Sequence, residues 1–157
     1  MVLTFPDYPD FKPSYTPKQI FELGSFGGTY FRPIYSSITK KNYKNQHTKH
    51  EFLLHIDEKL LISPIYDKNK NKYKVEVGSS LEEWENNGWI TNHDPYGWIQ
   101  WYCNFYEGRR IPHEDLRQIK RWISINNRFG KWFQKLKTQG KKSPKIQQTL
   151  LHWGISS

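Results

Sequence analysis

Apolar and polar residues follow two different patterns along this chain, and the change falls near residue 79. Beyond that point apolar residues recur every three or four positions, which is the spacing of the buried face of a helix. Before it, the apolar runs are short and are interrupted by proline and glycine, as in irregular structure with short strands. The pattern predicts a mainly α protein of the α+β class, with a small mixed N-terminal part packed on a C-terminal bundle of about four helices.

The N-terminal part begins with a proline-rich stretch, and residues 1–15 are expected to form an extended arm that lies on the body. Thr16 then provides a helix cap, Pro17 suits the first helical position, and Gly24 is placed to end that helix. Three further stretches have the composition of short strands, namely residues 29–38, 51–56 and 72–77.

Capping residues mark the ends of the predicted C-terminal helices. Ser79 or Ser80 forms a capping box with the glutamate three positions later, and Gly88 is placed to end that helix. The Asp94-Pro95 pair opens a second helix, which a glycine at position 108 closes. Three more helices are expected, one from about residue 113, one over residues 128–140 and one that Ser143 opens and Gly154 ends.

The second of these helices is rich in aromatic residues, with the sequence DPYGWIQWYCNFYEGRR over residues 94–110. On a helical wheel most of its rings share one broad face with Ile99 and Cys103, whereas Gln100 and Glu107 lie on the opposite strip. Such amphipathicity is typical of a core helix. Most of these rings are therefore expected to be buried rather than to stack on a ligand.

Composition limits the class and the setting of the protein. Of the 157 residues, 17% are aromatic and one, Cys103, is a cysteine. A single cysteine excludes an internal disulfide and a cysteine-rich zinc site, and it fits a reducing compartment. Neither a signal peptide nor an apolar run of the ~20 residues that a membrane span needs is visible. We expect one domain over residues 1–157 in an intracellular protein of the cytoplasm or nucleus, or of a virion, that is neither secreted nor membrane-bound.

The net charge of +9 belongs entirely to the last part of the chain. Residues 1–100 contain 12 basic and 12 acidic residues, whereas residues 101–157 contain 12 basic and 3 acidic residues. An asymmetry of this kind indicates an anionic partner, of which nucleic acid is the usual one. The alternative is a basic face that is merely solvated and reflects a composition rich in lysine and asparagine.

Arginines are prominent among these basic residues. Arg117, Lys120 and Arg121 fall within about a third of the circumference of the helix that starts near residue 113. A guanidinium holds phosphate with a fork of donors, which the point charge of lysine does not offer. The alternative is that Arg117 and Arg121 pair with Glu114 and Glu107 and tie helices together. Seven residues are predicted to contact a nucleic-acid backbone, namely Arg109, Arg110, Arg117, Lys120, Arg121, Arg128 and Lys131.

The segment NNRFG, residues 126–130, separates two of the predicted helices. Two helices joined by a short turn allow a helix-turn-helix, in which the second helix would read the major groove of DNA. Trp132 and Phe133 of that second helix are expected to pack inward.

Motifs of common catalytic and cofactor sites are missing from the sequence. GSFGG, residues 24–28, lacks the lysine and hydroxyl residue of a phosphate-binding loop, no Gly-x-Ser-x-Gly elbow occurs, and the histidines do not have the spacing of a metal site. No metal and no cofactor is predicted. Gly27, Gly28 and Arg32 are candidates for an anion-binding turn. The candidates for catalysis are Asp94, Gln100, Glu107 and Glu114.

Five blocks follow one another along residues 10–154: SFGGTYFRPIYSS, SLEEWENNGWI, DPYGWIQWYCNFYEGRR, DLRQIKRW and SPKIQQTLLHWG. Together they resemble a family of eukaryotic and large-DNA-virus proteins that has no assigned activity. The family consists of small stand-alone proteins, so the resemblance implies one complete domain and a eukaryotic or viral intracellular setting. It implies no substrate and no catalytic residue.

The leading interpretation is a nucleic-acid-binding protein whose basic C-terminal helices hold the phosphate backbone, with a role in DNA or RNA processing or repair. One alternative is an enzyme whose pocket, lined by Asp94, Gln100 and Arg32, takes a nucleic-acid or phosphorylated substrate. Another is a structural or virion-associated protein that packages nucleic acid. The sequence does not separate DNA from RNA, single from double strand, or one oligomeric state from another.

Overall fold

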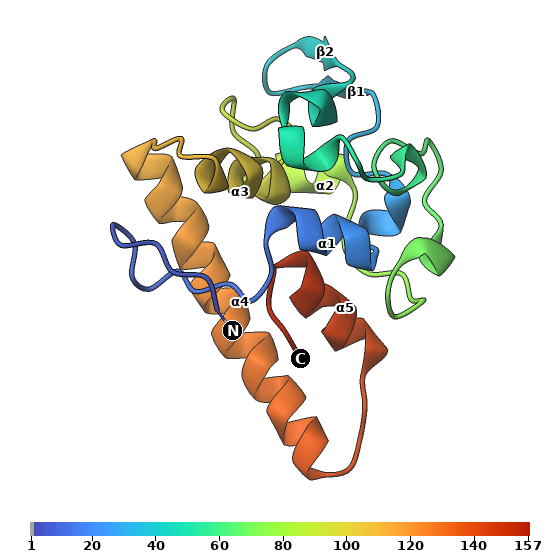
Figure 1. The fold of residues 1–157 in the computed structure, drawn as a ribbon, viewed down its shortest axis with the longest axis vertical. Coiled ribbons are helices and arrows are strands. Elements are labelled where there is room, and N and C mark those ends of the chain that lie inside the picture. The colour runs from blue at the N-terminus through green and yellow to red at the C-terminus, as the bar shows by residue number, and fades with distance from the viewer. Residues whose placement is uncertain (1) are drawn as a thin grey trace.

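Helices make up most of the regular structure, and one small sheet lies at an end of the molecule (Figure 1). The computed structural model describes residues 2–157. Two short strands, β1 (Ile34–Ser36) and β2 (Lys41–Tyr43), pair antiparallel. The α-helices are α1 (Pro17–Leu23), α2 (Leu81–Asn86), α3 (Trp98–Tyr106), α4 (Pro112–Thr138) and α5 (Pro144–His152). Single 3₁₀ turns occur at η1 (Phe26–Gly28), η2 (Gln46–Lys49), η3 (Glu51–Leu53), η4 (Glu58–Leu60) and η5 (Lys68–Lys70). The predicted class, mainly α with a small strand-containing N-terminal part, is confirmed.

Three helices begin at the caps that the sequence predicts. Thr16 and Gln19 form a capping box at the start of α1, and Gly24 ends that helix with a φ of 102°. The side chain of Ser80 caps α2, and that of Ser143 caps α5. Each cap satisfies a backbone N–H that the first turn of the helix cannot use itself, which is why these local signals suffice to place the helix starts.

Residues 2–15 contain no helix or strand and lie against the helical core. Phe11 is fully buried, with its ring 5.2 to 6.0 Å from the rings of Trp98 and Trp122. The backbone N–H groups of Ser14 and Tyr15 both donate to the carbonyl of Gly154. The segment before α1 is therefore held at both the core and the end of α5.

The predicted strands at residues 51–56 and 72–77 are wrong, and that at residues 29–38 is too long. In the first stretch Leu53 and Ile56 are buried while Leu54 is exposed, so burial recurs every three residues, as in the 3₁₀ turn that forms there. The stretch from residue 72 is drawn into a loop by the buried Asn71, whose Nδ2 donates to the carbonyl of Val75.

The strand predicted over residues 29–38 is reduced to β1. Its first part turns instead, because the backbone N–H of Arg32 bonds the carbonyl of Thr29. This turn sends the rings of Tyr30 and Phe31 together into the core, where a flat strand would place them on opposite faces. Burial of two adjacent rings has therefore overridden strand propensity.

Helix α3 starts three residues later than predicted, at Trp98, and its N-cap is Gly97. Asp94 does not cap it, because the carboxylate accepts hydrogen bonds from Asn104 and Arg109 instead. The side chain of Gln100 folds back to accept from the N–H of Tyr96, so it satisfies the backbone just before the helix. Apart from Asn104 and Tyr106, the residues of α3 are all buried, more completely than the amphipathic pattern predicts.

The two helices predicted on either side of NNRFG are one helix. α4 runs without a break from Pro112 to Thr138, so no helix-turn-helix exists at residues 126–130. Gly130 lies inside the helix, since Phe129 and Phe133 on either side of it both pack toward α5, with Ile146 and Leu150. Packing on this face outweighs the cost of about 1 kcal/mol of a glycine in a helix.

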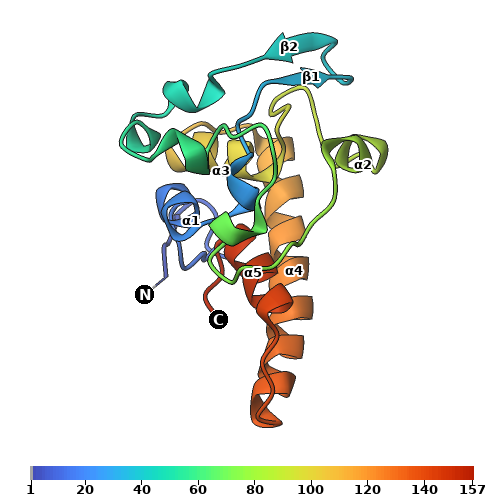
Figure 2. The same ribbon diagram turned by 90° about the vertical axis from the view of Figure 1, so that its right-hand side faces the viewer.

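The molecule has a large core and a smaller one. The large core surrounds α3 and includes Phe11, Phe21, Phe31 and Trp122. The smaller core lies between the C-terminal half of α4 and α5. In both views the end of α4 and the loop to α5 project beyond the rest of the chain, at the end opposite the β1–β2 hairpin (Figures 1 and 2).

Candidate ligand pocket and adjoining basic surface

Three of the seven arginines and lysines predicted to bind nucleic acid are paired with acidic residues of the same chain. Arg109 binds Asp94 through two hydrogen bonds of 2.6 and 2.9 Å. Arg110 binds Asp7 at 2.7 Å, and its guanidinium lies 3.7 Å from the centre of the Phe105 ring. Arg117 pairs with Glu114 at 2.6 Å, which is one of the two pairs that the alternative interpretation proposed. These three side chains stabilise the fold, and their charges are already balanced.

The candidate catalytic carboxylates are also used within the fold. Asp94 is 1% exposed, and burial raises its pKa although Arg109 and Asn104 act in the opposite direction. Burial likewise opposes ionisation of Glu114, but hydrogen bonds from Arg117 and Thr91 together lower its pKa.

The remaining catalytic candidates are held at other places. Glu107 bonds the ring of His50 rather than Arg121, and Gln100 lies within the core beside Tyr96. Arg32 donates to the carbonyl of Thr29. The structure therefore does not gather Asp94, Gln100 and Arg32 around an open cavity.

The glycines considered for an anion-binding turn serve close packing instead. The N–H of Gly27 donates to Asn71 and that of Gly28 to the carbonyl of Ser25, so neither is offered to an anion. A Cβ on Gly27 would lie 2.5 Å from the ring of Tyr66, and one on Gly28 would lie 2.4 Å from a backbone oxygen. Glycine is required here because the loop that carries Tyr66 crosses directly over the turn.

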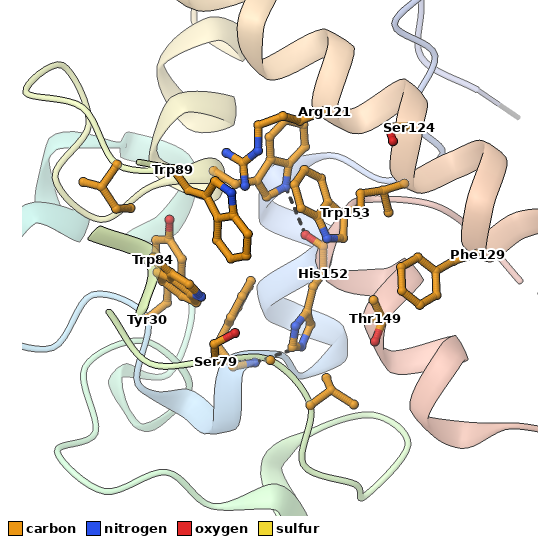
Figure 3. A pocket seen from close by; sticks show the side chains of 16 residues that line it. Tyr30, Ser79, Trp84, Trp89, Arg121, Ser124, Phe129, Thr149, His152 and Trp153 are labelled. Carbon is orange, nitrogen blue, oxygen red and sulfur yellow. Dashed lines mark hydrogen bonds between the residues drawn. The ribbon is translucent and has the colours of Figure 1, made fainter. Parts of the chain in front are cut away.

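The structure contains a cavity of about 400 Å³ that the sequence did not predict. It lies between the segment from α2 to Ile90, the middle of α4 and the end of α5. Half of the residues that line it carry aromatic rings, counting His152, and none of them is acidic. In the close view, rings of Trp84 and Trp89 face those of Phe129 and His152 across the cavity, with Arg121 and Trp153 beside them (Figure 3).

The seven tryptophans divide into two groups. Three are anchored by their indole N–H groups: Trp98 to the carbonyl of His152, Trp101 to Asp115 and Trp122 to the carbonyl of Trp153. The indole N–H groups of the other four, Trp84, Trp89, Trp132 and Trp153, have no hydrogen-bond partner within residues 2–157. Three of these four line the cavity and the fourth, Trp132, lies nearby on α4. Trp84 and Trp153 are half-buried and Trp89 and Trp132 are exposed, so these N–H groups are open to solvent and can donate to a ligand.

Arg121 is the one basic residue of the cavity wall, and it has no acidic partner in the described part of the chain. Its guanidinium donates from Nη1 to Gln118 Oε1 at 2.8 Å and lies 5.6 and 5.3 Å from the rings of Trp89 and Trp153. Burial, with a smaller effect of nearby Arg117, lowers the pKa of Arg121 to about 10, so the side chain stays charged at neutral pH. A cation in this position favours an electron-rich or anionic ligand.

His152 forms a neutral part of the same wall. Its Nε2 accepts a hydrogen bond of 3.2 Å from the backbone N–H of Phe26 and one of 3.0 Å from the side-chain amide Nε2 of Gln148. Two donors at Nε2 place the ring proton on Nδ1, and burial lowers the pKa of His152 to about 3. The imidazole is therefore uncharged at neutral pH.

A basic surface begins at the edge of the cavity and extends along the projecting end of the molecule. No acidic residue follows Asp115 in the sequence. The surface comprises seven exposed residues, none of which lies within ion-pair distance of a carboxylate in residues 2–157: Arg128, Lys131, Lys135, Lys137, Lys141, Lys142 and Lys145. Of the residues predicted from sequence, Arg128 and Lys131 belong to this basic surface, and Lys120 is exposed further up α4.

Aromatic side chains connect the basic surface to the cavity. Phe129 lines the cavity, and its ring stacks on that of Trp132 with 6.1 Å between centres. The guanidinium of Arg128 lies 5.4 Å from the centre of the Phe129 ring. Trp132 is 50% exposed, so the prediction that it packs inward is wrong, whereas Phe133 is buried as predicted. Phe133 occupies the space toward α5 and leaves Trp132 on the side that faces solvent.

Sequence reasoning missed the cavity because its residues come from distant parts of the chain, from Phe26 to Trp153. One signal was present: Trp84, Trp89 and Trp153 lie outside the aromatic helix and near glycines that end helices. No helical-wheel argument assigned these rings to the core.

Comparison of the chain with models of protein families, with curated proteins and with solved structures finds no match. Within the described residues no group of three or more histidine, cysteine or acidic side chains is placed to hold a metal ion. No helix among residues 2–157 combines the length and apolarity that crossing a membrane requires.

Proposed function

We propose that the protein binds nucleic acid through the basic surface defined above. The observation that carries this proposal is the set of seven exposed cations on the end of α4, the following loop and the start of α5, in a segment with no acidic residue. Phosphate contacts supply most of the affinity of non-specific nucleic-acid binding, and each one requires a lysine or arginine that is not already neutralised.

The proposal differs from the sequence-based one in the residues that carry it. Arg109, Arg110 and Arg117 are excluded, because pairing with an acid leaves little charge for phosphate. Arg128 and Lys131 remain, and five lysines toward the C-terminus join them. Lys120 is exposed on the same helix, about two turns before Arg128, and is not counted in the basic surface.

The number of phosphates held determines how binding responds to salt. If about four phosphates of a single strand are neutralised, the logarithm of the affinity falls with the logarithm of salt concentration with a slope of about −2.8. Raising salt from about 50 to 200 mM should then weaken binding about 50-fold. Fluorescence anisotropy with labelled single- and double-stranded oligonucleotides measures both the affinity and this slope.

A charge-reversed variant tests the location of the surface. Replacing Lys131, Lys135 and Lys142 with glutamate should weaken binding more than tenfold and make the salt slope shallower by about two. The matched control replaces Lys41, Lys44 and Lys49 with glutamate, which changes the net charge equally but at the hairpin end of the molecule (Figure 2).

The control variant should keep the wild-type slope. Equal weakening in both triple variants would show that only the overall charge matters, and wild-type binding that ignores salt would refute the proposal outright. Circular dichroism at several temperatures checks that both variants are folded.

A further inference from the structure

We propose that the aromatic cavity receives one unstacked base of the nucleic acid that the basic surface holds. This inference rests on the proposed function and adds the part of the ligand that the cavity recognises. The cavity, the arginine in its wall and its position beside the basic surface each support it.

The shape and lining of the cavity suit a small flat ring. Its volume of about 400 Å³ lies near the lower end of the range of about 300–1,000 Å³ for small-molecule pockets. The side chains of Trp84 and Trp89 lie on one side of the cavity and that of Phe129 on the other (Figure 3). Aromatic side chains bind bases by stacking, because every base has a flat π face.

The charge of the wall identifies the class of ring. Arg121 would repel a cationic ligand, and no acidic side chain among the lining residues would attract one. A lipid chain would leave the guanidinium and the indole N–H groups of Trp84 and Trp89 without acceptors. A base carries ring nitrogen and carbonyl acceptors, and a guanidinium forks onto such a pair of acceptors, as on the O6 and N7 atoms of guanine.

The position of the cavity connects the base to a strand rather than to a separate small molecule. Ser124 and Phe129 of α4 line the cavity, and Arg128 lies between them in sequence on the basic surface. Trp132, stacked on Phe129 and half exposed, extends the aromatic path outward along α4. A strand whose phosphates lie along the basic surface thus passes the cavity mouth, where one base can leave the stack and enter.

The test compares two labelled single strands of the same length and charge, one with ordinary bases and one with abasic sites at its central positions. The phosphates of both strands are the same, so the basic surface cannot distinguish them. The base-containing strand should bind wild-type protein at least about fivefold more tightly, which is the lower end of what one stacked base contributes.

Trp89→Ala removes one stacking face and should abolish this preference, while affinity for the abasic strand and its salt slope stay as in wild type. The control is Tyr35→Ala, which removes an aromatic ring that is 55% exposed on β1 and does not line the cavity, and it should leave the preference intact. Arg121→Lys keeps the charge but loses the fork, so the preference should fall there as well.

The outcomes separate this inference from the proposed function. Salt-dependent binding of both strands with equal affinity would overturn the base-binding cavity and leave the proposed function standing. If neither strand bound, both the inference and the proposed function would be overturned. A preference that survives in a folded Trp89→Ala variant would place base recognition elsewhere.

Photocrosslinking of wild-type protein needs no variant to fold. A strand carrying 4-thiouracil at one position should attach to the peptides that contain Trp84, Trp89 or Phe129. Attachment confined to peptides outside the cavity would also overturn the inference.

Discussion

Replacing Arg109 with methionine should destabilise the protein by about 3–5 kcal/mol at neutral pH, because it leaves a buried carboxylate without its counter-charge. Asp94 is 1% exposed and accepts three hydrogen bonds, two from Arg109 at 2.6 and 2.9 Å and one from Asn104 at 2.9 Å. Methionine keeps much of the apolar stem of arginine, so the loss reports the charge and its hydrogen bonds more than packing.

The size of the loss should depend on pH in a defined direction. Burial already raises the pKa of Asp94 above 3.8, and removal of Arg109 raises it further. The folded variant then binds a proton at pH values where the unfolded chain does not. Its stability relative to wild type therefore recovers as the pH falls through the raised pKa, and the destabilisation should be smaller at pH 5 than at pH 7.

Urea unfolding followed by tryptophan fluorescence gives the free energies for wild type, Arg109→Met, Asp94→Asn and the double variant. The double variant should regain part of the loss, since no charge remains buried. Arg110→Met is the control, because its partner Asp7 is exposed and the loss should be much smaller. An equal loss at both pH values, with no recovery in the double variant, would contradict the reasoning.

Two further predictions concern the fold around the cavity. The folded pKa of His152, about 3, lies below its ordinary 6.5, so its contribution to stability is complete above pH 6.5 and is lost as the pH falls toward 3. Wild type should therefore lose about 2 kcal/mol more than His152→Gln between pH 7.5 and 5 in urea titrations, and parallel curves would argue against a buried neutral imidazole. Gly27→Ala adds a Cβ 2.5 Å from the Tyr66 ring at a φ of 59°, whereas Gly140→Ala has a similar φ of 69° and nothing within 4 Å. Thermal unfolding should show that Gly140→Ala lowers the stability by about 1–2 kcal/mol. Gly27→Ala should lower it by about 1–3 kcal/mol more than Gly140→Ala does, because of the contact with Tyr66. Similar losses in the two variants would show that this contact relaxes freely.

The features that local chemistry determines were predictable from the sequence. Thr16, Ser80 and Ser143 each cap a helix with a hydrogen bond to a residue three positions away, and a bond of that range is visible in a pattern. The helical class and the burial of most of the aromatic helix follow from periodicity in the same way.

The features that depend on distant partners were not predictable. Asp94 has the sequence context of a helix cap, but Arg109, 15 residues away, takes its carboxylate. Arg110 is paired across 103 residues with Asp7, so its charge is not available although its sequence position suggests otherwise. NNRFG has the composition of a turn, and only the packing of Phe133 on α5 shows why the helix continues.

For the basic surface, the sequence located the cluster of cations in the last third of the chain, but it did not show that Arg109, Arg110 and Arg117 are paired with acids. Charge counts do not show which cations are neutralised in the fold. The cavity was beyond prediction because Phe26, Trp84, Arg121 and Trp153 meet only after every helix is in place.

The hydrogen bonds from Ser14 and Tyr15 to Gly154, together with that from Trp98 to the carbonyl of His152, have a consequence for biosynthesis. The aromatic surface of α3 is synthesised well before the segment that completes its cover, so a growing chain holds these rings partly unshielded until residue 154 has left the ribosome. An exposed aromatic surface of this kind is what chaperones bind and what drives aggregation of unfinished chains. Translation speed through α4 and α5 thus sets how long the nascent protein depends on such protection.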